Sequence, residues 1–300
     1  MKIMVIGANG QLGWELCRRG IKEGLDILPL DLPGFDITDH PSVQETMARQ
    51  DVSLVINASA YTAVDQAESE TELAFAINRD GPSYLASACS DAGIPLIHIS
   101  TDYVFDGSTK NPYCETDPVC PLGVYGKSKV EGEKKVRELL DEHIILRTAW
   151  LYGVHGNNFV KTMLRLGKEQ ERLRVVADQY GCPTFAGDLA DTVLNIAARI
   201  SGTDDITWGT YHYCSKGKTT WHEFTEKIFE LARQHISLKV KKVEPITTQE
   251  YPTPAKRPAD TALDCSMIND RLGISPRPWE ESLEKMIAHT FSGENEADHL

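Results

Sequence analysis

Positive charge is scarce in this chain. It has 31 lysine and arginine residues against 44 aspartate and glutamate residues, a formal net charge of −13 over 300 residues. Binding to nucleic acid or to an anionic membrane surface needs a basic face, so the composition argues against both kinds of partner. An anionic substrate would have to be held by a local group of cations.

Cysteine pairs and long apolar runs are also lacking. The seven cysteines are scattered, and none forms a Cys-x-x-Cys pair, so neither a zinc site nor a disulfide framework is indicated. No apolar run approaches the length of a membrane span, and Met1 leads into an apolar segment without the layout of a signal peptide. We therefore expect a cytoplasmic protein with no membrane partner.

A glycine motif follows the first apolar run. Residues 2–6 form a short β-type segment, and Gly7, Gly10 and Gly13 come directly before a helical pattern. Glycines in this context permit a tight turn and a close approach of the backbone to a pyrophosphate at a helix N-terminus. The alternative is a simple strand-to-helix turn, but three glycines in register favour dinucleotide binding.

The second expected strand ends at Asp31, about 20 residues beyond this motif. A carboxylate there accepts hydrogen bonds from the ribose hydroxyls of the adenosine half and repels a 2′-phosphate. This favours NADH, although a nearby arginine would accommodate NADPH. The expected cofactor is therefore NADH or NADPH.

A helix beginning near Tyr125 would place Tyr125 and Lys129 on one face, because residues four apart are neighbours there. An ammonium close to a phenol is expected to lower the tyrosine pKa from about 10 towards the range useful for catalysis. The hydroxyl of Thr101 (or Ser100), at the end of the preceding strand, can bond the same substrate oxygen. The alternative is an ordinary surface tyrosine and lysine.

Strand and helix patterns alternate over the first half of the chain and loosen afterwards. The alternation predicts an α/β fold, a Rossmann-type doubly wound parallel sheet that binds ligands at the carboxyl ends of its strands. Within it, one long helix is expected over residues 65–92; Asn78 in its middle either bonds backbone near the active site or is solvated. We expect an NAD(P)-binding domain over 1–150, with about 187–215 returning to it, a smaller α/β substrate-binding domain over about 151–186 and 216–291, and a disordered tail over 292–300.

Taken together, the glycine motif, the Ser100-Thr101 strand end and the Tyr-x-x-x-Lys pair resemble the extended short-chain dehydrogenase/reductase superfamily. Finer segments resemble the dTDP-4-dehydrorhamnose reductase family over nearly the whole chain, except the tail. These segments are GANGQLGWEL, NASAYTAVDQAE, STDYVFDG, PLGVYGKSKVEGE, RTAWLYG, GNNFVKTML, DQYGCPT and YPTPAKRP.

The resemblance implies roles for individual residues. Tyr125 would be the proton donor, Lys129 its partner on the nicotinamide ribose, and Thr101 the hydroxyl that tunes the pair. The implied cofactor contacts are Gly10, Gln11 and Leu12 under the pyrophosphate, Asp31 at the ribose, Asp36 and Ile37 on the adenine side, and Ala60, Tyr61 and Thr62 beside the nicotinamide half. The implied substrate contacts are Thr101, Asp102, Tyr103 and Trp150.

The implied activity is reduction of the 4-keto group of dTDP-4-dehydro-L-rhamnose by NADPH or NADH, a step towards surface polysaccharide. One alternative is a non-catalytic NADP-binding regulatory subunit. The presence of both members of the Tyr–Lys pair argues against it. Another is a nucleotide-sugar epimerase or dehydratase; dehydratases of the superfamily usually carry an acidic pair beside the strand-end threonine, and Thr101 is followed by a single acid, Asp102.

The family resemblance also implies Mg²⁺ bound by acidic residues of two subunits in a homodimer. Glu15 matches one such residue, but the acidic pattern around Gly187 and Asp188 is thinner than the family pattern.

A proline-rich loop over residues 251–258 carries Lys256 and Arg257. The prolines limit the entropy lost on binding, and a guanidinium suits bidentate contact with phosphate. We expect Arg257 to bind the diphosphate of the sugar nucleotide.

Overall fold

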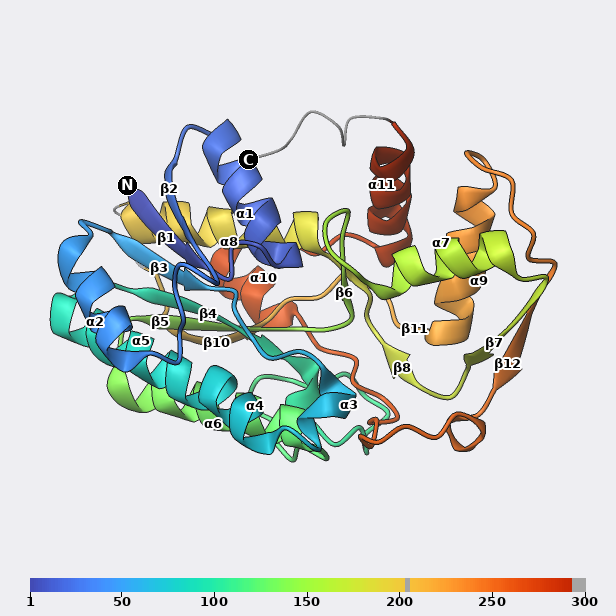
Figure 1. Ribbon diagram of the computed structural model, residues 1–300, viewed down its shortest axis with the longest axis horizontal. Coiled ribbons are helices and arrows are strands. Elements are labelled where there is room, and N and C mark those ends of the chain that lie inside the picture. Colours follow the sequence, from blue (N-terminus) through green and yellow to red (C-terminus); the bar gives the residue numbers. More distant parts are fainter. Residues whose placement is uncertain (203–205, 293–300) are drawn as a thin grey trace.

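The computed structural model describes residues 1–202 and 206–292. Residues 293–300, which make up most of the tail expected to be disordered, lie outside this range. The core of the fold is a six-stranded sheet with helices on both faces and a second group of helices and short strands beside it (Figure 1).

All neighbouring strands of the sheet are parallel, and their order is β2-β1-β3-β4-β5-β10. Strand order reverses beside β1, so the switch point of the sheet lies between β1 and β3. Ligands of such sheets bind in the crevice at this point, beyond the carboxyl ends of the strands. The strands are β1 (Lys2–Ile6), β2 (Asp26–Leu30), β3 (Leu54–Asn57), β4 (Leu96–Thr101), β5 (His143–Thr148) and β10 (Gly209–His212).

Each face of the sheet is covered by helices whose apolar residues pack on the strands. One face is covered by α1 (Gln11–Lys22), α8 (Ala186–Ser201) and α10 (Ser266–Leu272), and Leu16 and Val193 belong to its core. The other is covered by α2 (His40–Arg49), α5 (Gly81–Ala92) and α6 (Val124–Leu139), with Val43, Leu85 and Val136 in its core. The predicted doubly wound α/β fold is confirmed.

A second group of elements lies to the right of the sheet in Figure 1 and has a hydrophobic cluster of its own, in which Phe224, Phe229 and Leu283 are fully buried. Its short strands pair β7 with β12, β8 with β11, and β6 with β9. Its elements are β6 (Leu151–Tyr152), α7 (Phe159–Glu169), β7 (Arg172–Val176), β8 (Tyr180–Gly181), β9 (Thr184–Phe185), β11 (Thr219–Thr220), α9 (Trp221–Ala232), β12 (Lys242–Ile246), η3 (Thr248–Glu250) and α11 (Trp279–Phe291).

The single helix expected over residues 65–92 is wrong. The segment is divided into α3 (Val64–Ala67), α4 (Thr71–Phe75), the π-helical turn η1 (Ala76–Asp80) and α5. Glu68, in the first gap, accepts a hydrogen bond from the backbone N–H of Val124 at the start of α6. Pro82 has no N–H to donate to the carbonyl of Asn78, which removes one α-helical bond and favours the wider turn.

The π turn points Asn78 inward, where it is 1% exposed. Its side chain accepts from the N–H of Tyr61 and donates to the carbonyl of Tyr61 and to the hydroxyl of Ser128. Of the two expectations for Asn78, backbone bonding near the active site is therefore correct.

In the part of the chain that the structure describes, no helix has the length and apolarity needed to cross a membrane.

Candidate active site

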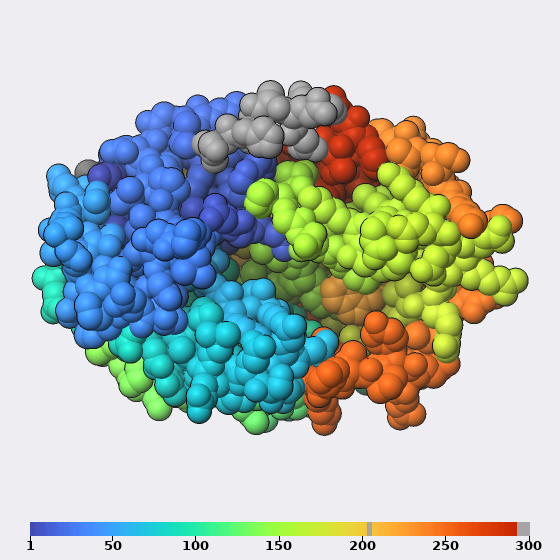
Figure 2. Space-filling model, viewed as in Figure 1, coloured from blue at the N-terminus to red at the C-terminus, as the bar shows by residue number. Residues whose placement is uncertain are grey.

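A cavity of about 840 Å³ lies at the carboxyl ends of the central strands. It reaches from the glycine loop after β1 to the segment after β5 and to the start of α9. Figure 2 shows the surface hollowed where the blue and cyan N-terminal segments meet the yellow-green and orange segments. This is the position expected for the ligand of a doubly wound sheet.

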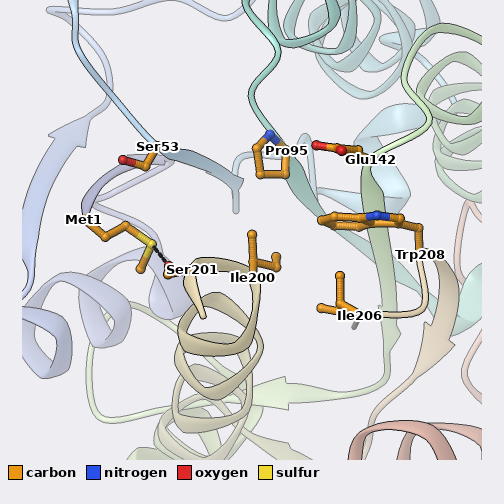
Figure 3. Close-up of a pocket in the computed structure, with 8 residues that line it drawn as sticks. All are labelled: Met1, Ser53, Pro95, Glu142, Ile200, Ser201, Ile206 and Trp208. Carbon is orange, nitrogen blue, oxygen red and sulfur yellow. Dashed lines mark hydrogen bonds between the residues drawn. The ribbon is translucent and has the colours of Figure 1, made fainter. Parts of the chain in front are cut away.

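A second cavity, of about 660 Å³, lies at the opposite ends of the strands (Figure 3). Ser53, Pro95 and Glu142, which line it, directly precede β3, β4 and β5. Met1, Ile206, Trp208 and the end of α8 also line it. It lies away from the switch point and is lined by none of the predicted site residues.

The glycine loop has the geometry that the sequence predicts. Gly7 has a φ of +82°, and a Cβ there would lie 2.6 Å from the backbone nitrogen of Ser59. Gly10 is the N-cap of α1, so free backbone N–H groups of that helix face the cavity. Gly13 does not line the cavity. A Cβ on it would meet the carbonyl oxygen of Gly7 at 2.0 Å, so its role is to let α1 pack closely against β1.

Gly7, Gly10, Gln11, Leu12, Asp31, Asp36, Ile37, Ala60 and Thr62 all line the cavity. The carboxylate of Asp31 accepts hydrogen bonds from the N–H groups of Asn9 and Leu32, both at 2.8 Å. Asp31 therefore joins the end of β2 to the glycine loop.

Tyr61 does not line the cavity, although the family resemblance placed it there. Its side chain is buried, and its hydroxyl donates to Glu70 at 2.7 Å. Asn78 holds its backbone in place. Tyr61 fixes the strand end that presents Ala60 and Thr62.

Thr101, Tyr125 and Lys129 line the same part of the cavity. Thr101 ends β4 and forms the N-cap of the short 3₁₀ turn η2 (Asp102–Val104), accepting from the N–H of Tyr103. Tyr125 and Lys129 lie one turn apart on the buried side of α6, with exposed fractions of 9% and 2%. The structure thus brings the three predicted catalytic residues together.

The expected lowering of the Tyr125 pKa is wrong for this structure. Burial raises the pKa of Tyr125 to about 12; a hydrogen bond with Thr101 acts in the opposite direction, and Asp102 raises the pKa further. The amine of Lys129 instead donates to the carbonyl oxygen of Ile99 at 2.7 Å. Burial lowers the pKa of Lys129 to about 8, with Glu133 acting against that shift.

Asp102, Tyr103 and Trp150 also line the cavity. Asp102 is 2% exposed and accepts hydrogen bonds from the hydroxyls of Thr101 and Thr261. Burial raises its pKa to about 6, and both hydroxyls oppose that rise. A carboxyl group with this pKa changes charge just below neutral pH, in the wall of the cavity.

Trp150 has a φ of 45°, in the left-handed region that a bulky residue rarely adopts. Its ring stacks on Trp221 with a centroid distance of 3.5 Å and an interplanar angle of 5°. A Cβ on Gly181 would lie 2.4 Å from the ring, so glycine is required there. The strained backbone and tight packing fix Trp150 in the cavity wall.

Arg257 does not line the cavity. Its guanidinium forms an ion pair with Asp65 of α3 at 2.8 Å, and its side chain is 18% exposed. It lies near enough to the cavity residue Tyr103 to lower the pKa of that phenol, against the effect of burial. The structure therefore places Arg257 beside the cavity with its charge already paired.

Comparison with known proteins decides the family. A family profile described as "RmlD substrate binding domain" matches residues 1–291. A dTDP-4-dehydrorhamnose reductase of Aggregatibacter actinomycetemcomitans is 43% identical over 290 residues, covering 96% of this chain and 99% of that protein. The chain belongs to the dTDP-4-dehydrorhamnose reductase family.

Two solved structures with that name share the fold of this family member. The structure from Clostridium acetobutylicum has 43% identity and a TM-score of 0.90, and the one from Bacillus anthracis, in complex with NADP, has 41% identity and a TM-score of 0.90. Each alignment covers 96% of this chain and 99% of the other. The resemblance inferred from the sequence motifs is confirmed.

Sequence reasoning missed the aromatic wall of the cavity. Trp221, Phe159 and Phe224 line it together with Trp150. They lie at the starts of α7 and α9, where apolar residues are equally expected to form the helix core. The fold alone shows that they face the ligand side, so the sequence carried no signal for them.

The magnesium ion that the resemblance implied at Glu15 is not supported. The Glu15 carboxylate is 1% exposed and accepts from the guanidinium groups of Arg18 and Arg19, at 3.1 and 2.8 Å. Arg19 also pairs with Asp191. Among the residues at 1–202 and 206–292, no group of three or more histidine, cysteine or acidic side chains is placed to hold a metal. Two arginines on one carboxylate do not fit a cation site.

Proposed function

We propose that this protein reduces the 4-keto group of dTDP-4-dehydro-L-rhamnose to give dTDP-L-rhamnose, with NADPH or NADH as the reductant. The observation that carries the proposal is the convergence of Thr101, Tyr125 and Lys129 in the cavity that the glycine loop enters. Reductases of this name that are more than 40% identical over nearly the whole chain support it.

The nicotinamide cofactor would lie along the carboxyl ends of the strands. Its pyrophosphate would meet the N–H groups at the start of α1, and a ribose would meet the carboxylate of Asp31. Asp36 and Ile37 would contact the adenine side, and Ala60, Thr62 and Lys129 the nicotinamide side. When bound, the cofactor supplies the hydride that the ketone carbon accepts.

Tyr125 would supply the proton. Because its pKa is raised to about 12, the phenol keeps its proton at neutral pH. As charge develops on the sugar oxygen, the O–H bond of Tyr125 breaks and a new O–H bond forms on that oxygen. The hydroxyl of Thr101, which donates to Asp102 in this structure, would turn to donate to the same oxygen, and the ammonium of Lys129 would stabilise the phenolate that remains.

The substrate would occupy the end of the cavity formed by Asp102, Tyr103 and Trp150. We further propose the division expected from the sequence, a cofactor domain over 1–150 to which about 187–215 return and a substrate domain over about 151–186 and 216–291. Within the last range, α10 is the exception, because it packs on the central sheet. The separate hydrophobic cluster beside the sheet supports it. A homodimer in the cytoplasm is proposed on the family resemblance alone.

Replacing Tyr125 with phenylalanine tests the chemistry. Tyr125→Phe is expected to lower kcat by about 100-fold or more and to leave the dissociation constant for NADPH unchanged, because the variant lacks only the transferable proton. Turnover is followed by loss of the reduced-nicotinamide absorbance with dTDP-4-dehydro-L-rhamnose. Tyr103→Phe, which removes another hydroxyl from the same cavity, is the control and is expected to retain most of kcat.

Near-wild-type turnover of Tyr125→Phe would exclude the assigned role. A wild-type protein that converts the nucleotide sugar without stoichiometric oxidation of the cofactor would be an epimerase or dehydratase. A protein that binds NADP but turns over no keto-sugar nucleotide would be the regulatory subunit.

A further inference from the structure

A chain of hydrogen-bonded polar groups leads from the cavity wall to a buried position beneath the Tyr125–Lys129 pair. It runs from Ser59 through Asn57 at the end of β3 and His98 in the middle of β4 to Lys129 of α6. The exposed fractions are 0% for Asn57, 0% for His98 and 2% for Lys129. Polar groups buried this deeply are stable only where each donor meets an acceptor, so the direction of every bond can be assigned.

The backbone fixes the first bond. The N–H of Ser59 can only donate, and it lies 3.1 Å from Oδ1 of Asn57, which also accepts from the Ser59 hydroxyl at 2.7 Å. The amide nitrogen Nδ2 of Asn57 therefore faces His98, at 3.1 Å from Nδ1. Since Nδ2 can only donate, Nδ1 of His98 must accept. A neutral imidazole that accepts at Nδ1 carries its hydrogen on Nε2.

That Nε2–H points at Lys129. The distance from His98 Nε2 to Lys129 Nζ is 3.5 Å, and Nζ donates to the carbonyl oxygen of Ile99 at 2.7 Å. A neutral amine satisfies this arrangement: its lone pair accepts from Nε2–H, one hydrogen goes to Ile99, and the other is left for the cavity. An ammonium has no lone pair, so one of its hydrogens would oppose Nε2–H.

We propose that His98, with its tautomer set by Asn57, is a positioning residue that acts through Lys129. Its Nε2–H holds the Lys129 amine in place beside Tyr125 and disfavours the ammonium form. The proposal rests on the proposed function, because the charge of Lys129 matters to activity only if the cavity takes the nicotinamide cofactor and the keto sugar. It makes Lys129 a group that gains and loses its proton near pH 8.

The other charged groups around Lys129 are consistent with this role. From its own helix, Tyr125 is a neutral phenol and Glu133 favours the ammonium. Glu133 is itself held by Arg147 of β5, by Arg137 and by the hydroxyl of Ser100. From β4 the facing group is His98, whose pKa burial and the charges of Lys129 and His143 keep well below its usual value. His98 is therefore neutral and contributes a directed N–H rather than a charge.

The tautomer is measured directly by ¹⁵N NMR of the imidazole nitrogens in the wild-type protein without ligands. The signals of His98 are assigned as those that disappear from the spectrum of a His98 variant. We expect this histidine to be neutral and protonated at Nε2 from about pH 6 to 9. A hydrogen on Nδ1, or an imidazolium at neutral pH, would overturn the proposal. This measurement involves neither substrate nor turnover, so its outcome is independent of the proposed reaction.

Two substitutions separate positioning from packing. His98→Asn keeps an acceptor near the position of Nδ1 for Asn57 but removes the donor that faces Lys129. His98→Gln places an amide N–H near the position of Nε2 and restores that donor. The pH dependence of kcat/KM and of the dissociation constant for NADPH is measured for both variants and for the wild type.

Removing the donor stabilises the ammonium and raises the pKa of Lys129, so the ammonium persists to higher pH. The alkaline fall in kcat/KM, expected near pH 8 in the wild type, should move upward by about one pH unit in His98→Asn and return towards the wild-type position in His98→Gln. A lowered melting temperature with an unchanged pH midpoint in both variants would reduce His98 to a packing residue. If neither variant folds, the tautomer of His98 in the wild-type protein still tests the proposal, because a hydrogen on Nδ1 would overturn it.

Discussion

At the scale of single residues, the carboxylate of Asp31 can bond both the glycine loop and a ligand in the cavity. In this structure its carboxylate accepts from the N–H groups of Asn9 and Leu32 and still lines the cavity. Those two bonds hold the negative charge at the end of β2, where the adenosine ribose of a dinucleotide lies. Asp31 thus fixes the glycine loop, and its charge is the feature that we propose to discriminate between NADH and NADPH.

Replacing Asp31 with serine removes the charge that repels a 2′-phosphate. Asp31→Ser is expected to shift the ratio of kcat/KM for NADPH over NADH towards NADPH by about tenfold, which corresponds to about 1.4 kcal/mol. Steady-state kinetics with both cofactors measures this shift. A wild-type enzyme that already prefers NADPH more than a hundredfold would show that another residue overrides Asp31.

The identities of the candidate site residues could be inferred from the sequence, but the directions of their pKa shifts and their ion-pair partners could not. Spacing alone placed Tyr125 and Lys129 together, because helix geometry is local. The direction of the Tyr125 pKa depends on burial, and burial depends on segments far away in the chain. The partner of Arg257 was missed for the same reason: Asp65 lies 192 positions away. Sequence patterns predict local neighbours better than distant ones.

At the scale of elements, α6 carries the proposed catalytic residues Tyr125 and Lys129, and an ion pair anchors this helix to the sheet. The carboxylate of Glu133 accepts from both Arg147 Nε and Nη2, at 2.8 and 2.7 Å, and its exposed fraction is 0%. Gly132 allows the helix to approach the π turn, since a Cβ there would lie 2.0 Å from the carbonyl oxygen of Asn78. The helix is therefore fixed from both sides.

Breaking this buried ion pair should destabilise the fold. Glu133→Gln leaves the charge of Arg147 buried without its counter-ion, and we expect a loss of about 3–5 kcal/mol in the free energy of unfolding. Urea denaturation at neutral pH measures it. Glu138→Gln, on an exposed position of the same helix where Glu138 pairs with Lys135, is the matched control and should cost about 1 kcal/mol or less.

The effect also has a pH signature. Burial alone would raise the pKa of Glu133, but Arg147 and its other partners outweigh burial and hold the folded pKa below the value in the unfolded chain. Its contribution to stability is therefore fully present above the unfolded pKa and is lost as the pH falls through the folded pKa. The difference between wild type and Glu133→Gln should shrink in acid, and a difference that is constant with pH would assign the loss to packing.

Elements with strong local signals were predicted well. The parallel, doubly wound arrangement of the sheet and the start of α6 near Tyr125 followed from residue patterns. The division of residues 64–92 into four pieces could not be predicted from residue patterns. Its causes are contacts with α6 and the inward turn at Asn78, and neither leaves a periodic signal in the sequence.

At the scale of the whole molecule, the cavity is closed by segments that meet only in the fold. The sheet and its cofactor-side loops come from the first half of the chain, whereas Trp221 and Phe224 come from α9. The loop over residues 251–258 reaches back to α3 through the Arg257–Asp65 pair. The overall α/β class was predictable from alternation, but the aromatic wall and this bridge depend on how the two groups of elements pack.

The bridge bears on how so acidic a chain binds an acidic substrate. A nucleoside diphosphate carries about two negative charges, and the net charge of −13 opposes its approach. Arg257 lies beside the cavity in a loop stiffened by prolines, and Asp65 orients its guanidinium. A diphosphate that enters offers the same guanidinium a second anionic partner, and bidentate contact suits its planar shape.

Arg257→Ala is therefore expected to raise the KM for the sugar nucleotide about tenfold or more, equivalent to at least about 1.4 kcal/mol, with little change in cofactor affinity. Asp65→Asn is the matched control: it removes the competing carboxylate but keeps the arginine, so KM should stay the same or fall. Steady-state kinetics and direct titration of NADPH measure the two ligands separately. If Arg257→Ala weakened both ligands equally, or neither, Arg257 would have no place in the substrate site. If Asp65→Asn raised KM as much as Arg257→Ala does, the pair would act by holding the loop in place, because both substitutions break the bridge but only one removes the cation.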